Sequence, residues 1–175
     1  MDLKKYIRSI PDYPKKGILF RDITTLIKDK DAFKECIGQM SKMITKLSFD
    51  KIASIESRGF VFASALCYNL SKSLILMRKK DKLPAAKYSQ EFKLEYGKAT
   101  LELHKDSVMP KEKVLIIDDL IATGGTSEAG AKLVEKSGGI VAGFIFVINL
   151  FDMGGRKLLE DKGYKTFSLI DFPGH

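Results

Sequence analysis

The sequence predicts an α/β fold in which a central parallel sheet is flanked by helices. Short apolar runs typical of buried strands alternate along the chain with segments that have helical periodicity. Such alternation implies parallel strands joined by helices that cover both faces of the sheet. The length of 175 residues suits a single domain with a substantial core, so we expect residues 1–175 to form one domain.

The individual elements follow in order. Apolar residues at Phe33, Ile37, Met40, Ile44 and Leu47 mark one face of the first long helix by their spacing of four and three. Gly138 and Gly139 indicate where a later helix stops. The expected elements after the first helix are a strand at 51–56, a helix from Gly59 to Leu70, strands at 73–77 and 113–117, a helix from Gly125 to Ser137, a strand at 140–148, a short helix near 154–162 and a last strand at 165–170.

Two segments do not fit the strand–helix alternation. Residues 1–30 are rich in turn-forming residues, and we expect an N-terminal hood, a cap near one end of the sheet. Residues 82–104 contain alternating runs such as "TLELH", which favour an antiparallel hairpin. In sheets of this class, ligands bind at the carboxyl ends of the strands, so both segments are candidates for covering a site.

Composition narrows the class of function. The formal charge is +8, from 30 basic and 22 acidic residues, but the lysines are dispersed and form no basic stripe with aromatic residues. We therefore expect no nucleic-acid partner. No apolar run reaches membrane-spanning length and the N-terminal residues lack the apolar core of a signal peptide. Cys36 and Cys67 form no CxxC motif and fit core thiols in a reducing, cytoplasmic setting.

The stretch "VLIIDDLIATGGTS" (114–127) predicts an anion site. We expect a strand to end before Asp118 and Asp119, and a helix to begin at Gly125. The turn between them offers unpaired main-chain N–H groups and the positive end of a helix dipole. The glycines permit close approach and the threonines donate hydroxyls. We call this turn the phosphate cradle; it comprises Ala122, Thr123, Gly124, Gly125 and Thr126.

The two carboxylates would repel a phosphate, so they require another ligand group nearby. A ribose diol fits, because carboxylates accept hydrogen bonds from vicinal hydroxyls. A sugar with its 5′-phosphate in the cradle and its hydroxyls at Asp118 and Asp119 satisfies both halves. The cradle is neither a P-loop nor a dinucleotide-binding fingerprint, because G-x-x-x-x-G-K-[ST] and G-x-G-x-x-G are both absent.

This stretch resembles the phosphoribosyl-pyrophosphate (PRPP) motif of the type I phosphoribosyltransferases. Four further segments, "IPDYPKKGILFRDITTLIKD", "IESRGFVFASAL", "RKKDKLP" and "LEYGKATLELHKDSV", resemble in that order the landmarks of the adenine phosphoribosyltransferases. The resemblance covers roughly 10–172. It implies transfer of the 5-phosphoribosyl group from PRPP to N9 of adenine, giving AMP and pyrophosphate in purine salvage. It also implies Mg²⁺, carried mainly by PRPP and pyrophosphate rather than by protein ligands, and a homodimer.

The resemblance assigns roles to further residues. Ser57, Arg58, Arg78, Lys79 and Lys82 would bind pyrophosphate, some of them from the neighbouring subunit, whereas Lys80 is expected to be a solvated charge. Asp81 stands where the family has glycine, which puts pyrophosphate affinity in question. Main-chain groups of Leu19 and Arg21 would read adenine between the side chains of Phe20 and Leu120, although Phe20 fits ordinary core packing equally well. Catalytic roles fall on Arg58 and on Glu95 and Tyr96, carried by a flexible loop of the hairpin; Glu95 would handle the proton of the base.

Three alternatives remain open. Another phosphoribosyltransferase would act on hypoxanthine, guanine, uracil or orotate, but the hood and the "ESRGF" and "LEYG" segments favour adenine. A PRPP-sensing regulator would be expected to carry a DNA-binding segment. A PRPP synthetase would need a longer chain with a site for a nucleoside triphosphate.

Overall fold

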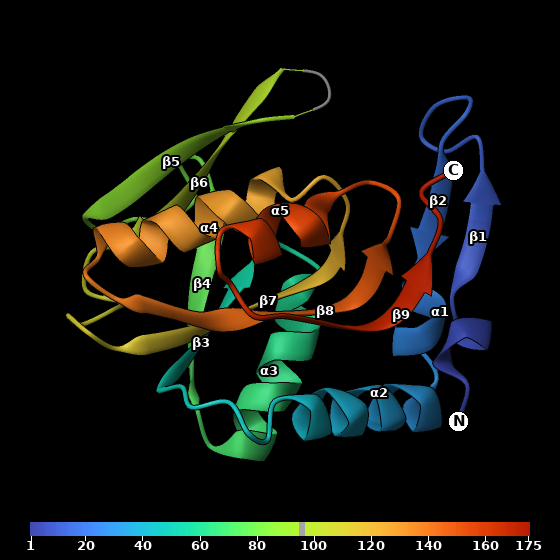
Figure 1. Cartoon of the computed structure of the whole chain (residues 1–175), viewed down its shortest axis with the longest axis horizontal. Coiled ribbons are helices and arrows are strands. Elements are labelled where there is room, and N and C mark those ends of the chain that lie inside the picture. The colour runs from blue at the N-terminus through green and yellow to red at the C-terminus, as the bar shows by residue number, and fades with distance from the viewer. Residues whose placement is uncertain (95–96) are drawn as a thin grey trace.

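The computed structural model describes residues 1–94 and 97–175. In this part of the chain, seven strands form a mixed sheet in the order β5-β6-β4-β3-β7-β8-β9 (Figure 1). Parallel neighbours make up most of the sheet: β4 (Ser73–Lys79), β3 (Lys51–Ile55), β7 (Lys113–Ile121), β8 (Ile140–Leu150) and β9 (Thr166–Phe172). The antiparallel pair β5 (Lys87–Lys93) and β6 (Lys98–His104) completes it at one edge.

Helices cover both faces of the sheet, as expected. Helices α2 (Lys30–Met43) and α3 (Gly59–Leu70) lie on one face, and α4 (Gly125–Lys136) and α5 (Gly155–Asp161) on the other (Figure 1). The side chains of β7 alternate between the two layers: Leu115 and Ile117 pack in the cluster with α2 and α3, and Val114 and Ile116 in the cluster with α4. A strand buried on both sides needs this continuous apolar run.

The N-terminal hood consists of the 3₁₀ turn η1 (Leu3–Tyr6), β1 (Arg8–Pro11), β2 (Leu19–Asp22) and α1 (Thr24–Ile27). Strands β1 and β2 pair in antiparallel fashion beside β9 (Figure 1). Ile23 and Leu26 are buried in the same cluster as α2 and α3, so the hood shares the core of the domain. Asp22 ends β2; hydrogen bonds from Thr24 and Arg8 lower its pKa to about 2.

The predicted antiparallel hairpin is present as β5 and β6. Because β6 also pairs with β4 in antiparallel fashion, the hairpin joins the central sheet and makes it mixed. Two expectations are wrong in detail. Strand β7 runs on to Ile121, so Asp118 and Asp119 lie within it rather than beyond its tip; pairing with β8 as far as Ile121 keeps these residues extended. Helix α2 ends at Met43, before the last apolar residues of the predicted face.

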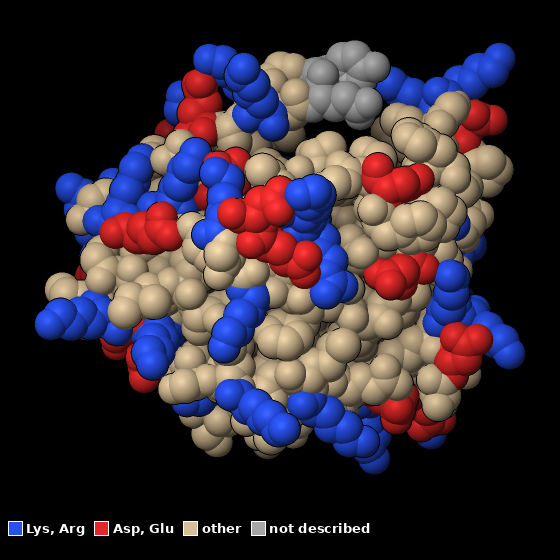
Figure 2. All heavy atoms as spheres, in the orientation of Figure 1, with Lys and Arg blue, Asp and Glu red and all other residues tan. Residues whose placement is uncertain are grey.

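Figure 2 shows basic and acidic side chains intermixed over one face of the molecule. No helix among the described residues is long and apolar enough to cross a membrane. Cys36 and Cys67 are free and buried, and burial raises the pKa of the Cys36 thiol to about 12 and that of the Cys67 thiol to about 11. Both are therefore inert core thiols.

Candidate active site

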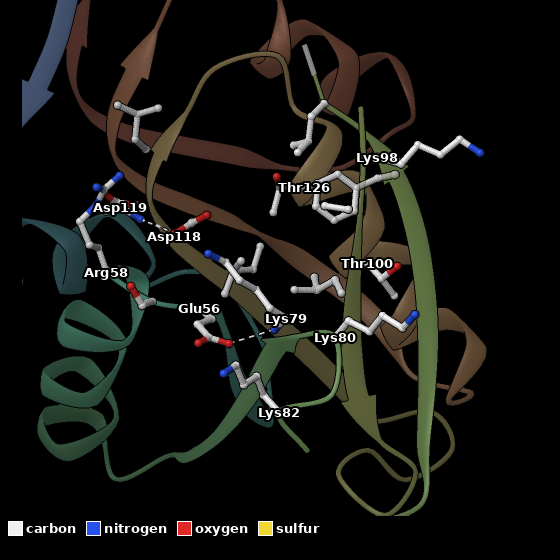
Figure 3. Close-up of a pocket in the computed structure, with 17 residues that line it drawn as sticks. Glu56, Arg58, Lys79, Lys80, Lys82, Lys98, Thr100, Asp118, Asp119 and Thr126 are labelled. Atoms are coloured by element: carbon white, nitrogen blue, oxygen red, sulfur yellow. Dashed lines mark hydrogen bonds and ion pairs between the residues drawn. The ribbon is translucent and has the colours of Figure 1, made fainter. Parts of the chain in front are cut away.

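A cavity of about 920 Å³ opens at the carboxyl ends of β3, β4 and β7 (Figure 3). Parallel strands deliver these three ends to one edge of the sheet, which is where ligands bind in such folds. The hairpin β5–β6 forms the facing wall. Each segment contributes lining side chains: Glu56, Ser57 and Arg58 after β3, Lys79, Lys80 and Lys82 around the end of β4, Asp118, Asp119 and Leu120 in β7, and Phe92, Leu94 and Thr100 in the hairpin.

A smaller hollow of about 160 Å³ lies over the phosphate cradle and shares Asp118, Leu120 and Thr126 with the large cavity. Gly124 adopts a φ of +87°, and a Cβ built there would lie 3.0 Å from the Cα of Gly155. The N–H of Gly155 donates to the carbonyl of Ala122 at 2.9 Å. A main-chain hydrogen bond from the start of α5 therefore holds the cradle in place. Because of the positive φ and the nearby main chain of Gly155, only glycine fits at position 124.

The carboxylate pair lies between the two hollows. Asp118 is half-buried, and its Oδ1 accepts a hydrogen bond from the N–H of Asp119 at 2.9 Å. Burial, followed by the negative charge of Asp119, raises the pKa of Asp118 well above its ordinary value. Asp119 is buried and accepts a hydrogen bond of 2.6 Å from Nε of Arg58. Gly59 begins α3 close by, where a Cβ would lie 2.9 Å from Asp118 Oδ1.

We call residues Lys79–Lys82 the lysine turn. Lys79, Lys80 and Lys82 are exposed and line the large cavity, and Lys79 points into it (Figure 3). Arg78 is directed elsewhere: its guanidinium lies 3.3 Å from Glu56 Oε1 and donates to the carbonyl of Lys82. Hydrogen bonds from the Lys79 N–H and then from Arg78 lower the pKa of Glu56. The three ammonium groups make this part of the cavity suited to an anion.

The hood reaches the site through Phe20. The guanidinium carbon of Arg58 lies 5.6 Å from the centroid of the Phe20 ring, on the same side of β2 that faces the cavity. Side chains alternate along a strand, so the side chain of Arg21 points the other way. It donates to Ser9 Oγ at 2.5 Å and to the carbonyl of Pro173 at 2.9 Å. The side chain of Arg21 is therefore not directed at the site, and any contact of this residue with a ligand there would come from its main chain.

Comparison with known proteins agrees with this geometry. The family model described as "Phosphoribosyl transferase domain" matches residues 24–174. Adenine phosphoribosyltransferase of Pelagibacter ubique (strain HTCC1062) is 66% identical over 175 residues, covering 100% of both chains. The chain belongs to the adenine phosphoribosyltransferase family.

Solved structures of this family have the same fold. Adenine phosphoribosyltransferase from Thermoanaerobacter pseudethanolicus superposes with a TM-score of 0.94 at 48% identity, covering 98% of each chain. The enzyme from Saccharomyces cerevisiae, solved with D-2,5-dideoxy-2,5-imino-altritol 1,6-bisphosphate and adenine, superposes with a TM-score of 0.89 at 30% identity, covering 97% of each chain. The family fold therefore extends over the hood and the hairpin as well as the sheet.

Most residues that the sequence nominated come together in the structure. Ser57, Arg58, Lys79, Lys82, Asp118, Asp119, Leu120 and Thr126 line the large cavity, and Ala122, Thr123, Gly124 and Gly125 line the smaller hollow. Arg78, Leu19, Phe20 and Arg21 do not line either. Glu95 and Tyr96 lie outside the described residues. The roles of all these residues remain predictions.

Sequence reasoning missed several lining residues of this member of the family. Lys80 is exposed, as expected of a solvated charge, and it also lines the cavity, which the sequence did not indicate. Phe92 and Ala99 are cross-strand partners in the hairpin and both line the cavity. The pairing register of β5 with β6 could not be predicted without knowing where the hairpin turns. Glu56 could have been predicted as a lining residue, because it directly precedes Ser57 and Arg58 at the end of a strand.

Proposed function

We propose that this protein transfers the 5-phosphoribosyl group from PRPP to N9 of adenine, forming AMP and pyrophosphate. One observation carries the proposal: a carboxylate pair lies between the phosphate cradle and the lysine turn in adjoining hollows. PRPP has the same order of groups, a 5′-phosphate, a ribose diol and a pyrophosphate. Full-length relatives named adenine phosphoribosyltransferase support the choice of base.

The cradle binds the 5′-phosphate and the carboxylates bind the ribose. Main-chain N–H groups at the start of α4, with the hydroxyls of Thr123 and Thr126, supply donors to a phosphate without any basic side chain. Asp118 and Asp119 accept hydrogen bonds from the two ribose hydroxyls. Arg58 already occupies Oδ2 of Asp119, which leaves Oδ1 of Asp119 available for a hydroxyl.

Pyrophosphate binds across the cavity, where Ser57, Arg58, Lys79 and Lys82 provide donors and positive charge, with Arg78 as a more distant member of the set. Within residues 1–94 and 97–175, no cluster of three or more His, Cys, Asp or Glu side chains can hold a metal ion. Mg²⁺ prefers a few carboxylates together with substrate phosphate oxygens. Asp118 and Asp119 would be the carboxylates near a Mg²⁺ brought by PRPP, and the ion would supply positive charge to the phosphate groups.

The reaction is a substitution at C1′ of the ribose. The C1′–O bond to pyrophosphate breaks with its electron pair leaving on oxygen, N9 of adenine bonds to C1′, and the N9 proton is lost. Asp118 and Asp119 place negative charge beside the ribosyl ring, which favours positive charge developing there in the transition state. We assign Glu95 to the proton and Tyr96 to covering the pyrophosphate side; closure of their loop would exclude water.

Adenine binds between Leu120 and the hood. Main-chain groups of Leu19 and Arg21 read the edge of the base, and Phe20 and Leu120 pack on its faces. The contact between Phe20 and Arg58 supports this placement, because it brings β2 to the rim of the cavity. Adenine carries an amino group at position 6, which donates a hydrogen bond, whereas hypoxanthine and guanine carry a carbonyl group there, which accepts one. Main-chain groups on a fixed strand that match the adenine edge therefore reject these two bases.

We also propose a cytoplasmic homodimer made of single-domain subunits, each with a hood (residues 1–30) and a hairpin loop (residues 82–104). The resemblance to the adenine phosphoribosyltransferases supports the dimer. Lysines of the same chain line the cavity, and we propose that the neighbouring subunit adds further cations to the pyrophosphate site. Sedimentation at micromolar concentration tests this; a fully active monomer would contradict it.

A single assay tests the activity. The protein is mixed with PRPP and Mg²⁺ and with adenine, guanine or hypoxanthine in turn, and the nucleotide products are separated. We expect AMP from adenine and little product from the other bases. The isosteric Asp118→Asn, Asp119→Asn variant is the control that should lose turnover while remaining folded. Equal turnover of hypoxanthine would overturn the assignment to adenine and leave only the wider family.

A further inference from the structure

Glu102 is a buried carboxylate behind the lysine turn that the mechanism above does not use. It belongs to β6, is 3% exposed and does not line the cavity. Its Oε2 accepts a hydrogen bond from the N–H of Asp81 at 3.0 Å, and its Oε1 accepts one from the hydroxyl of Ser89 at 3.1 Å. A buried charge is costly unless hydrogen bonds satisfy it, so both of these contacts are structural anchors.

Besides the pairing of Lys79 with Leu101 of β6, three hydrogen bonds with side chains of other residues hold the main chain of the lysine turn. The N–H of Lys79 donates to Glu56 Oε2 at 2.9 Å, the N–H of Asp81 donates to Glu102, and the carbonyl of Lys82 accepts from Arg78 at 3.3 Å. These attachments use no lysine side chain. The main chain of the turn is therefore held beside the cavity, while the exposed lysine side chains remain available to a ligand.

Glu102 belongs to the hairpin, so its hydrogen bond from the Asp81 N–H joins the hairpin wall to the lysine turn. Ser89 is its cross-strand partner in β5 and holds the carboxylate within the hairpin. The carbonyl of Ser89 accepts a hydrogen bond from Lys136 Nζ of α4 at 2.9 Å, which attaches this part of the hairpin to the helix layer. Fixed spacing between the walls matters because a displacement of about 1 Å in a binding group can cost up to 100-fold in rate.

We propose that Glu102 is a positioning residue for the pyrophosphate site: by holding the Asp81 N–H and the Ser89 hydroxyl, it sets the lysine turn against the hairpin. The inference rests on the proposed function, since it takes pyrophosphate as the ligand of the lysine turn. A positioning role predicts that replacing Glu102 weakens pyrophosphate binding, which is opposite to what its charge alone predicts. Removing a negative charge next to an anion site strengthens binding by Coulomb's law, whereas losing the anchor weakens it.

The test compares Glu102→Leu, which removes both acceptors, with Glu102→Gln, which removes the charge but keeps the shape and an acceptor for the Asp81 N–H. Glu35→Leu on α2, where Glu35 accepts only from Gln39 among described side chains, is the matched control for loss of charge. Calorimetry gives the Kd for pyrophosphate with Mg²⁺, and steady-state kinetics give the KM values for PRPP and adenine.

We expect Glu102→Leu to raise the Kd for pyrophosphate and the KM for PRPP by about tenfold, with the KM for adenine within about twofold. Glu102→Gln and Glu35→Leu should stay within about threefold of the parent. If Glu102→Leu does not fold, Ser89→Ala removes one anchor and should raise the Kd for pyrophosphate by about two- to fivefold.

Tighter pyrophosphate binding by the folded Leu variant, or equal losses for Gln and Leu, would overturn the positioning role. So would unchanged affinity in Ser89→Ala. A parent protein that binds no pyrophosphate at all would instead overturn the proposed function, and the inference with it.

Discussion

The phosphate cradle and the lysine turn follow parallel strands of the same sheet, yet they are built to bind anions in different ways. Among the described residues that line the hollow over the cradle, none is basic, so a phosphate there depends on main-chain N–H groups and hydroxyls. The lysine turn offers three exposed ammonium groups instead. On our proposal, the first site recognises the shape of its anion, and the second attracts its anion mainly by charge.

Each turn contains one residue with a positive φ, and these two residues show the difference best. Gly124, at +87°, faces the main chain of Gly155, where a Cβ has no room. Asp81, at +63°, is exposed and carries a side chain. Packing of α5 therefore fixes the geometry of the cradle, whereas side-chain anchors such as Glu56 and Glu102 fix that of the lysine turn.

The largest effect is expected from alanine at these two positions. Gly124→Ala introduces left-handed strain of about 1–2 kcal/mol and a collision with Gly155 worth about 1–3 kcal/mol. Asp81→Ala introduces at most similar strain and no collision. Urea unfolding should show a loss of about 2–4 kcal/mol for Gly124→Ala and at most about half of that for Asp81→Ala. Equal losses would show that packing does not distinguish the two turns.

The next largest effect concerns the lysines. Lys79→Met with Lys82→Met removes two charges that line the cavity, and the Kd for pyrophosphate should rise by about 10- to 100-fold. Lys46→Met with Lys157→Met removes two exposed lysines elsewhere and should change the Kd by less than about twofold. Calorimetry with Mg²⁺ measures both. A comparable loss in the control would mean that net charge, not the lysine turn, governs affinity.

The affinities of the two sites for their ligands should also respond differently to salt concentration. Exposed charges are screened within about 10 Å at 0.1 M salt and about 3 Å at 1 M. Raising NaCl from about 0.05 M to about 0.5 M should therefore weaken pyrophosphate binding several-fold more than ribose 5-phosphate binding. Titrations of both ligands at the two salt concentrations check this. Parallel slopes would indicate that the cradle also depends on side-chain charge.

The smallest effect is expected from Asp81→Gly, which installs the glycine that the family resemblance implies at this position. The Asp81 carboxylate makes no hydrogen bond or ion pair within the described residues and does not line the cavity. Removing its exposed charge should tighten pyrophosphate binding by no more than about threefold. A larger gain would show that Asp81 acts directly on the bound anion.

The two turns also differ in how far the sequence predicted them. The start of the helix at Gly125 was predictable, because glycines and threonines directly after an apolar strand favour a strand-to-helix turn. The residues of the cradle line one hollow, as their adjacency in the sequence implies, and their phosphate role stays a prediction. The sheet with helices on both faces was predictable from the apolar runs of β7 and β8. In the lysine turn, the family resemblance nominated Lys79 and Lys82, whereas Lys80 was taken for a solvated charge because nothing local showed that it lines the cavity.

Long-range pairing accounts for most of what was missed. Glu102 and Ser89 are anchors only because β6 pairs with both β4 and β5, and such register follows from tertiary packing rather than local pattern. The length of β7 beyond Ile117 depends on pairing with β8. The side chain of Arg21 points away from the site because it donates a hydrogen bond to the carbonyl of Pro173, 152 positions later in the chain.

The most direct test of the account is a crossed measurement of two ligands on two variants. Thr126→Val removes one hydroxyl of the cradle without changing its shape, and the Lys79→Met, Lys82→Met variant removes the charges of the lysine turn. Calorimetry with ribose 5-phosphate and with pyrophosphate should show crossed losses. Thr126→Val should lose about tenfold for ribose 5-phosphate and little for pyrophosphate, and the lysine variant the reverse. Equal losses of both ligands in either folded variant, or losses in the opposite pattern, would contradict the assignment of the two sites.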